Sequence, residues 1–437
     1  MWEICIGNQT CRRGDNVGKS MHISTVIAFC LFGFVQGPPL QGSWWERTDP
    51  SRAPQLSAGC LMARSDLSSG TVQWVIPAIS TACARARGFL GTLPLRNKTC
   101  VDADLFQFQR DYSDTVRLRR GFDVRSRPVI FGHGALGTGL FACVEGIEAQ
   151  RFVEQLGAEV FAMQSDACFG SDLPPWARAG LSAHFELGGQ STPGTAGMRT
   201  PAAVVQLRAA LGGQSRIALS DLLARDRRRW ASAAAGGEDA SAAAIESWAL
   251  VEFLLSGASG NWGRCFQQML RLLASGANGD TAFNDAFGTG ETVAQALDAD
   301  WQKWCTALAP DPAAETADRL EFLAAGLREL ARRGETVVEF ERLHQRLGEI
   351  DFRHRVERGP SGRELAAADQ ANFKPAGGSG SFELVPPRKP LTRRRSGDAP
   401  QAPPALRTHD TQPELSIEWV SAPEEGQWTW LLRASRE

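Results

Sequence analysis

Two consecutive helices near the middle of the chain constrain the fold most strongly. Over 147–163 apolar residues recur at helical spacing, with Phe152, Leu156 and Val160 on one face. Two prolines then begin a second helix over 176–186, where proline suits the first turn. Because an apolar helical stripe must be buried against another layer, these helices predict the interior of a domain and not a surface attachment.

Strand-like segments precede the two helices, and further helices follow them. Segments 129–131 and 139–143 are short, apolar and bounded by glycine or proline, as strands are. Segments 242–255, 262–273 and 293–308 are apolar at helical spacing. The pattern predicts an α+β fold in which a mixed sheet packs on the first of the two helices, with a helical second lobe behind it.

The composition changes beyond residue 357. Glycine, serine, proline and arginine dominate 377–404, which predicts a flexible linker. Segments 415–420 and 427–432 alternate like the two strands of a small β-hairpin. The predicted organisation is an N-terminal extension with an apolar segment (1–42), a main domain (43–310), a helical extension (311–358), a disordered linker (359–412) and a C-terminal β-hairpin (413–437).

The N-terminal region resembles an export signal. Residues 23–35 are apolar and uncharged, too few to span a bilayer comfortably, and basic residues precede them. We therefore expect an exported protein, periplasmic or extracellular. The cleavage site is poor, so the alternative is a membrane anchor formed by 23–35, with membrane contact only if this segment is not cleaved. Met21 is an alternative start to Met1.

Charge and cysteine content narrow the function classes. The net charge is -2 and the sequence pI is about 6.4, so nothing favours nucleic-acid binding, which needs a basic face.

Seven cysteines follow the apolar segment, and Cys83–Cys100 and Cys265–Cys305 are conceivable disulfide pairs. The alternative for each is a small buried apolar side chain. No C-x-x-C occurs, which argues against a thiolate zinc site.

The first of the two central helices carries an unusual acidic position between small residues. Ala158 and Ala162 are four residues apart and therefore share one face of the helix, with Glu159 beside the first of them. Ala179 lies in the second helix, within the segment WARAGLSAHFE over 176–186. Two other segments, SWALVEFL over 247–254 and AFNDAFG over 282–288, follow in the helical region.

In their order and spacing these segments resemble the peptidase MA-like family of gluzincin-type metallopeptidases, and more narrowly a branch of exported bacterial proteins. The family has His-Glu-x-x-His on the first helix and a Pro-Trp-Leu-x-Glu-Gly-Leu segment on the second. It also has counterparts of the two later segments. The resemblance covers about 74–310 of this chain, and it implies a zincin-like domain.

The resemblance places the family's two zinc-binding histidines at Ala158 and Ala162 and its ligand glutamate at Ala179. Glu159 falls at the position of the general base. Alanine cannot coordinate a metal, and without the metal no water is activated. The resemblance therefore implies a pseudoenzyme with no catalytic residues, no zinc and no other cofactor, in which Glu159 is vestigial.

Three functions remain open from the sequence. The first is a non-catalytic binding or scaffold protein that takes a peptide or protein in the cleft, with 139–143 as the edge strand. The second is a hydrolase with a non-standard site that uses Glu159, with or without His184, or a migrated metal site of His184, Cys168 and Glu159. The third is a structural, envelope-associated protein that makes contacts through its C-terminal hairpin.

One motif competes with this interpretation. Residues 132–137 read G-x-G-x-x-G after a strand-like segment, as in dinucleotide-binding folds. The helix that should follow at once, and the βαβ repeat around it, are absent from the pattern. The alternative for these glycines is a hairpin or loop.

Overall fold

The computed structural model describes residues 55–58, 61–91, 93, 101–120, 127–134, 137–187, 199–213, 216–226, 230, 238–257, 261–358, 362–378, 380–386, 402–422 and 427–435. All of them belong to the unit Ala53–Glu437. The apolar segment 23–35 and the rest of the predicted 1–42 extension lie outside the described residues. Among the described helices, none has both the length and the apolar character needed to cross a membrane.

A five-stranded mixed sheet forms the first layer. Its strands are β1 (Gln55–Ala58), β2 (Leu61–Ser65), β3 (Val101–Phe106), β4 (Val129–Gly134) and β5 (Gly137–Cys143), in the order β1-β2-β3-β5-β4. The three central strands are parallel, and β1 and β4 run antiparallel to them at the two edges. The chain is thus a mixed α+β protein, as predicted.

The structure contradicts two expectations about the glycine-rich region: the edge strand and the dinucleotide-binding motif. Residues 139–143, proposed as an edge strand, belong to β5, which lies inside the sheet between β3 and β4; the edge strand is β4. In the hairpin β4 pairs with the outer side of β5. The alternation of residues along a strand does not predict which of two strands lies at the sheet edge. The glycines of 132–137 lie in this hairpin and begin no helix, so the dinucleotide-binding alternative is wrong.

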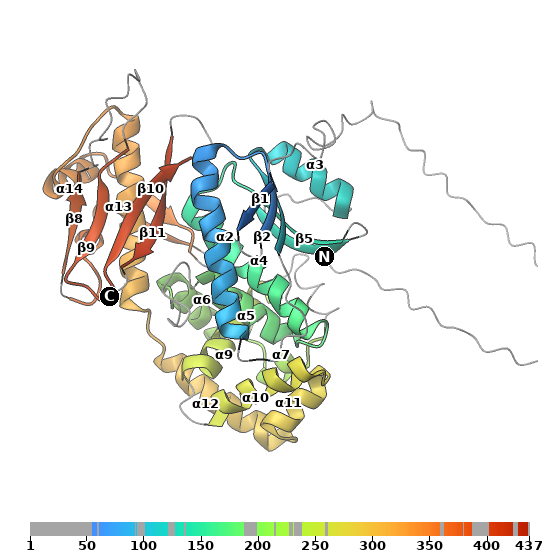
Figure 1. Cartoon of the computed structure of the whole chain (residues 1–437). Helices are drawn as coiled ribbons and strands as arrows, with labels where there is room; N and C mark the ends of the chain where they lie inside the picture. The colour runs from blue at the N-terminus through green and yellow to red at the C-terminus, as the bar shows by residue number, and fades with distance from the viewer. Residues whose placement is uncertain are drawn as a thin grey trace, which may run out of the picture. The chain divides into compact units, whose positions relative to one another are not determined.

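Three helices accompany the sheet (Figure 1). α2 (Ser69–Leu90) connects β2 to β3, α3 (Gln109–Arg120) connects β3 to β4, and α4 (Ala149–Phe169) follows β5. α2 and α4 pack side by side, and Trp74 meets Phe152 edge to face with ring centroids 5.5 Å apart. Both rings join the buried cluster beneath the sheet, so the predicted helical stripe is indeed buried.

A second, helical layer packs below α4. It comprises α5 (Pro175–Leu187), α6 (Pro201–Gly212), α7 (Leu219–Ala224), α9 (Glu238–Glu252) with a π-helical turn (Phe253–Gly257), α10 (Asn261–Ser275), α11 (Gly279–Phe287) and α12 (Glu291–Ala307). Trp176, Trp248 and Trp301 are fully buried in its core. Gly180 lets α5 approach α9 closely, because a Cβ there would overlap the carbonyl oxygen of Ser247.

The C-terminal part contains two helices and two antiparallel sheets. They are α13 (Pro312–Arg332), α14 (Phe340–Glu349), the pair β6 (Arg353–Val356) and β7 (Arg363–Ala366), a 3-10 turn (Gln370–Phe373), and β8 (Ser381–Val385), β9 (Ala405–His409), β10 (Leu415–Ser421) and β11 (Trp428–Ala434). The last four strands form one sheet in the order β11-β10-β9-β8. It shares a core with α13 and α14.

The predicted disordered linker over 359–412 is wrong over much of its length. β7, the 3-10 turn, β8 and β9 all fall inside it, whereas 387–401 lies outside the described residues. Phe382, Leu384 and Leu406 are buried in the core around α13, and this burial holds short strands together despite the surrounding glycine and proline. The terminal hairpin is therefore part of a larger sheet.

The C-terminal sheet also contacts the first layer directly. The backbone N–H of Leu432 donates to Gln150 Oε1 on α4 at 2.9 Å, and the indole of Trp74 on α2 donates to the Ser421 carbonyl at 3.2 Å.

The structure contradicts one of the two cysteine pairings considered from the sequence. Cys265 and Cys305 are both free thiols, so the pairing Cys265–Cys305 is wrong; Cys100 lies outside the described residues.

Candidate functional site

α4 and α5, the two helices singled out from the sequence, pack as an antiparallel pair. The rings of Phe161 and Phe185 stack with centroids 4.2 Å apart. Gly157 lets the helices touch, because a Cβ at this position would lie 2.8 Å from the carbonyl oxygen of Phe185. The close approach fixes which residues of the two helices face each other.

Two ion pairs join the helices at opposite ends of this contact. Near the start of α4, Arg151 Nη2 lies 2.9 Å from Glu186 Oε1 at the end of α5. Near the end of α4, Asp166 Oδ1 lies 3.4 Å from Arg178 Nη1 at the start of α5. Residues between 151 and 166 on α4 therefore run opposite residues between 178 and 186 on α5.

All four predicted site residues lie between these ion pairs. Ala158, Glu159 and Ala162 on α4 and Ala179 on α5 are each partly exposed. On α4 the partly exposed positions 151, 155, 158 and 162 recur at three- and four-residue steps, which is one helix face. The positions that the resemblance assigns to zinc ligands thus lie along one accessible face of an antiparallel helix pair.

Glu159 binds the edge strand of the sheet. Its Oε2 accepts a hydrogen bond from the backbone N–H of Phe131 in β4 at 3.0 Å. Cys143 donates to the Pro128 carbonyl, and ladder bonds alternate along an antiparallel pair, so the N–H of Phe131 points away from β5. The carboxylate therefore caps an outward-facing group of an edge strand.

The pKa of Glu159 is raised to about 7. Burial of the carboxyl group is the largest cause, and the charge of Glu186 adds to it. The hydrogen bond from Phe131 and the charge of Arg127 act in the opposite direction but do not cancel the effect. A carboxyl group with such a pKa can hold a proton near neutral pH.

Replacing Glu159 with glutamine is expected to stabilise the protein above pH 7. Between the ordinary value of 4.5 and about 7, the folded protein keeps a proton that the unfolded chain releases, so the free energy of unfolding falls as pH rises through this window. Glutamine keeps an acceptor for Phe131 and carries no charge. Since Glu159 is partly exposed, we expect a gain of about 1–2 kcal/mol at pH 8 in urea unfolding.

The control for this prediction is Glu339→Gln, which changes an exposed glutamate in the same way. It should change the free energy of unfolding by less than about 0.5 kcal/mol, as is usual for a substitution at an exposed position. An equal difference at both pH values for Glu159→Gln would contradict the prediction.

His184 contacts a carboxylate that the sequence did not single out. Its Nδ1 lies 2.6 Å from Oε1 of Glu252, the last residue of α9, and both residues are buried. The other oxygen of Glu252 is buried, and none of the residues that the structure describes forms a hydrogen bond with it. A carboxylate on Nδ1 fixes the orientation of an imidazole. The signal for Glu252 was an acidic residue inside the apolar segment 242–255.

The migrated metal site is not assembled among the described residues. His184 pairs with Glu252 and Glu159 with β4, and Cys168 is buried with its pKa raised to about 11 by desolvation. No group of three histidine, cysteine, aspartate or glutamate side chains arranged for a metal is found in the part of the chain that the structure describes.

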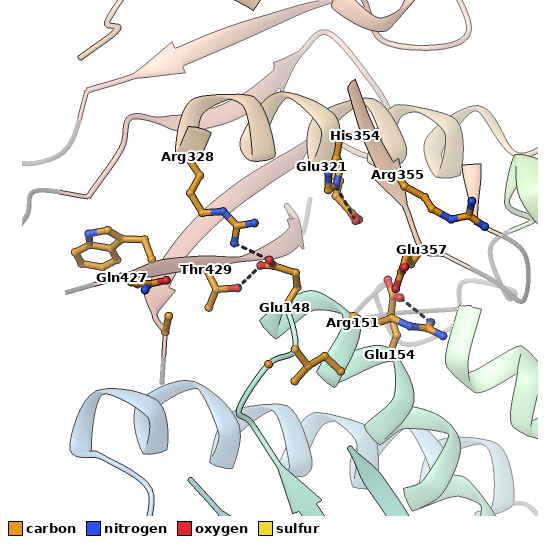
Figure 2. Close-up of a pocket in the computed structure, with 14 residues that line it drawn as sticks. Glu148, Arg151, Glu154, Glu321, Arg328, His354, Arg355, Glu357, Gln427 and Thr429 are labelled. Atoms are coloured by element: carbon orange, nitrogen blue, oxygen red, sulfur yellow. Dashed lines mark hydrogen bonds and ion pairs between the residues drawn. The ribbon is translucent and has the colours of Figure 1, made fainter. Parts of the chain in front are cut away.

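A cavity of about 490 Å³ lies at the N-terminal end of α4. Its walls come from the start of α4, from α13, from β6 and from the β10–β11 hairpin (Figure 2). In Figure 2, Arg328 and Thr429 converge on Glu148, which binds both: Arg328 Nη1 lies 2.6 Å and Thr429 Oγ1 2.9 Å from its carboxylate. No sequence pattern predicted this cavity, because its side chains come from four separate segments.

Arg358 does not line the cavity, but it binds two glutamates that do. This residue is only 3% exposed. Its guanidinium donates to Glu154 on α4 at 3.0 Å and to Asp318 and Glu321 on α13 at 2.9 and 3.0 Å. Burial raises the pKa of Asp318 to about 7, although Arg358 opposes the shift. One buried cation thus joins the C-terminal part to the central helix.

No protein-family model matches the sequence, and no curated protein is significantly similar to it.

Proposed function

We propose that this protein is an exported, zincin-like protein that has lost its zinc ligands, is not catalytic, and binds an extended peptide or protein segment along the edge strand β4. The observation that carries the proposal is the bond between Glu159 and Phe131. The residue that would activate water in a metallopeptidase instead caps the backbone of an edge strand. Ala158 and Ala162 are near Glu159 on α4, and Ala179 is on the facing helix α5.

The arrangement favours binding over catalysis for a physical reason. Hydrolysis at such a site needs a Lewis acid and a base that can reach the bound water. The side chains at the three former ligand positions are methyl groups. An edge strand, in contrast, offers backbone hydrogen bonds to any extended segment that lies alongside it. β4 is such a strand, and α4 lies next to it.

The other two functions have less support. A non-standard hydrolase would rest on the pair His184–Glu252, but Glu159 is engaged elsewhere, with Phe131. A contact role for the C-terminal hairpin would require exposed apolar side chains. Trp430 and Leu431 of β11 are instead fully buried within the protein.

The test is an assay of the full chain for metal and for peptide hydrolysis. We expect no stoichiometric zinc after dialysis against zinc-containing buffer, and no cleavage of a mixed peptide library. We expect any library peptide that binds to slow hydrogen exchange at β4 amides that point away from β5, such as that of Val129. The effect should be smaller at the amide of Ile130, which points toward β5. One zinc per chain, or hydrolysis that stops with Glu159→Gln, would overturn the proposal.

A further inference from the structure

An extended segment that adds to β4 has to pair with the backbone groups that point away from β5. Cys143 donates to the Pro128 carbonyl, and inward groups alternate with outward groups along an antiparallel pair. The N–H of Ile130 therefore points toward β5, whereas those of Val129 and Phe131 point away from it. The latter two are donors that a strand added at this edge would use.

The protein itself already occupies one of these donors. The N–H of Phe131 donates to Glu159 Oε2 at 3.0 Å. A carboxylate accepts a hydrogen bond more strongly than a neutral carbonyl group does. The backbone carbonyl of an incoming segment must therefore displace a stronger acceptor before it can bond to Phe131.

A rigid helix positions this acceptor. Glu159 lies in the middle of α4 (Ala149–Phe169), which packs directly on β4. Leu156 and Val160, on either side of Glu159 along the helix, are fully buried in the core beneath the sheet. Release of Phe131 therefore requires rotation of the Glu159 side chain and not movement of the helix.

Displacement costs free energy because the released carboxylate loses its donor in unfavourable surroundings. Burial disfavours the charge of Glu159, and Glu186 on α5 adds repulsion, while Arg127 acts in the opposite direction. A buried acceptor that loses its partner costs more than the net value of the hydrogen bond. This cost reduces the affinity of any strand that pairs with Phe131.

We propose that Glu159 is an intramolecular competitor that blocks strand addition at β4 until the backbone of an extended segment displaces it from Phe131. The proposal rests on the proposed function of β4 as a peptide-binding strand and adds the regulation of that site. An open edge strand pairs with any chain that offers an extended backbone, which is a route to aggregation. A competitor at this edge admits only segments that gain enough free energy elsewhere along β4.

The first measurement is hydrogen exchange of the full chain without a ligand at about pH 8, where most of the Glu159 carboxyl groups are ionised. In Glu159→Ala the amide of Phe131 should exchange roughly tenfold faster than in the unmodified protein, because its acceptor is gone. The amide of Val129, the neighbouring outward donor, should change less than about twofold. Equal exchange of Phe131 in both proteins would overturn the proposal.

The second measurement is calorimetric titration of the full chain with acetyl-Lys-Thr-Val-Thr-Val-Lys-amide, a peptide that favours the extended conformation. Glu159→Ala should bind it roughly tenfold more tightly than the unmodified protein does, since no competitor remains. Glu159→Gln keeps a neutral acceptor for Phe131, so its gain should be only about threefold. Glu341→Ala, the same change at an exposed position of α14, should bind the peptide as the unmodified protein does.

The outcomes separate this proposal from the one on which it rests. If the peptide binds the unmodified protein and Glu159→Ala equally well, β4 binds a strand but Glu159 does not compete with it. If Glu159→Gln gains as much as Glu159→Ala, the lost charge and not the lost acceptor is the cause, and the competitor is excluded. If Glu159→Ala is folded by circular dichroism but does not bind the peptide at about 1 mM, strand addition at β4 fails and its regulation fails with it.

Discussion

Replacing Arg358 with alanine is expected to lower the free energy of unfolding by about 3–5 kcal/mol. The guanidinium is buried and donates to Glu154, Asp318 and Glu321. Removing it leaves carboxylates in a region of low dielectric without a counter-charge. Repulsion and desolvation then oppose folding, and these costs are much larger than the net value of an exposed ion pair.

Arg353→Ala is the matched control for this prediction. Arg353 lies five residues earlier, in β6, and pairs with Asp351 at 3.2 Å, but both side chains are more than half exposed. Its loss should cost less than about 1 kcal/mol. Urea unfolding followed by tryptophan fluorescence measures both variants. Equal effects would show that the buried cluster does not hold the C-terminal part on α4.

The effect of Arg358→Ala should also depend on pH. Burial raises the pKa of Asp318 to about 7 even with the guanidinium present. Without it, protonation of the cluster becomes more favourable, so the variant should lose less stability at about pH 5 than at about pH 8. This pH dependence distinguishes an electrostatic cause from loss of packing alone.

The sequence predicted the central helices because their signal is local. The spacing of Phe152, Leu156 and Val160 and the prolines before Trp176 are sufficient to place α4 and α5 and to show which face is buried. α4 extends to Phe169, beyond the predicted end at 163, because helix ends depend on caps more than on periodicity.

Strand order could not be obtained in the same way. Whether β4 or β5 occupies the sheet edge depends on pairing between distant segments, and both strands look alike in the sequence. The linker prediction was wrong for a related reason. Glycine and proline around β8 and β9 indicate flexibility, while the burial of Phe382 and Leu406 against α13 is a tertiary effect.

The polar parts of the site were the least predictable. Glu159 was singled out by its place in a motif, but its bond to Phe131 depends on where the edge strand lies. Glu252 stands out in the sequence as an acidic residue in an apolar segment and Arg358 does not stand out, but for both residues only the packing of helices determines the partners, His184 and Glu154. Charged contacts between distant segments have no short-range signature.

If the zincin-like interpretation holds, placing the family's ligands at positions 158, 162 and 179 is expected to create a zinc site. The variant Ala158→His/Ala162→His/Ala179→Glu puts two imidazoles one turn apart on α4 and a carboxylate on α5. The positions are partly exposed and lie between the ion pairs Arg151–Glu186 and Asp166–Arg178, so the new side chains have room. We expect one zinc per chain with a Kd below about 1 μM, which corresponds to at least about 8 kcal/mol.

The control carries the same residue types in a different arrangement. In Ala158→His/Ala167→His/Ala179→Glu the histidines are nine residues apart and point to opposite sides of α4. Both variants should retain the circular dichroism spectrum of the unmodified protein, which shows that differences in zinc binding do not come from unfolding.

Zinc stoichiometry of these two variants, measured by mass spectrometry after dialysis, tests the central claim most directly. If Ala158, Ala162 and Ala179 occupy a former metal site, the first variant retains one zinc and the second retains little. If the folded first variant holds no more zinc than the control, the three positions do not converge and the zincin-like interpretation is wrong.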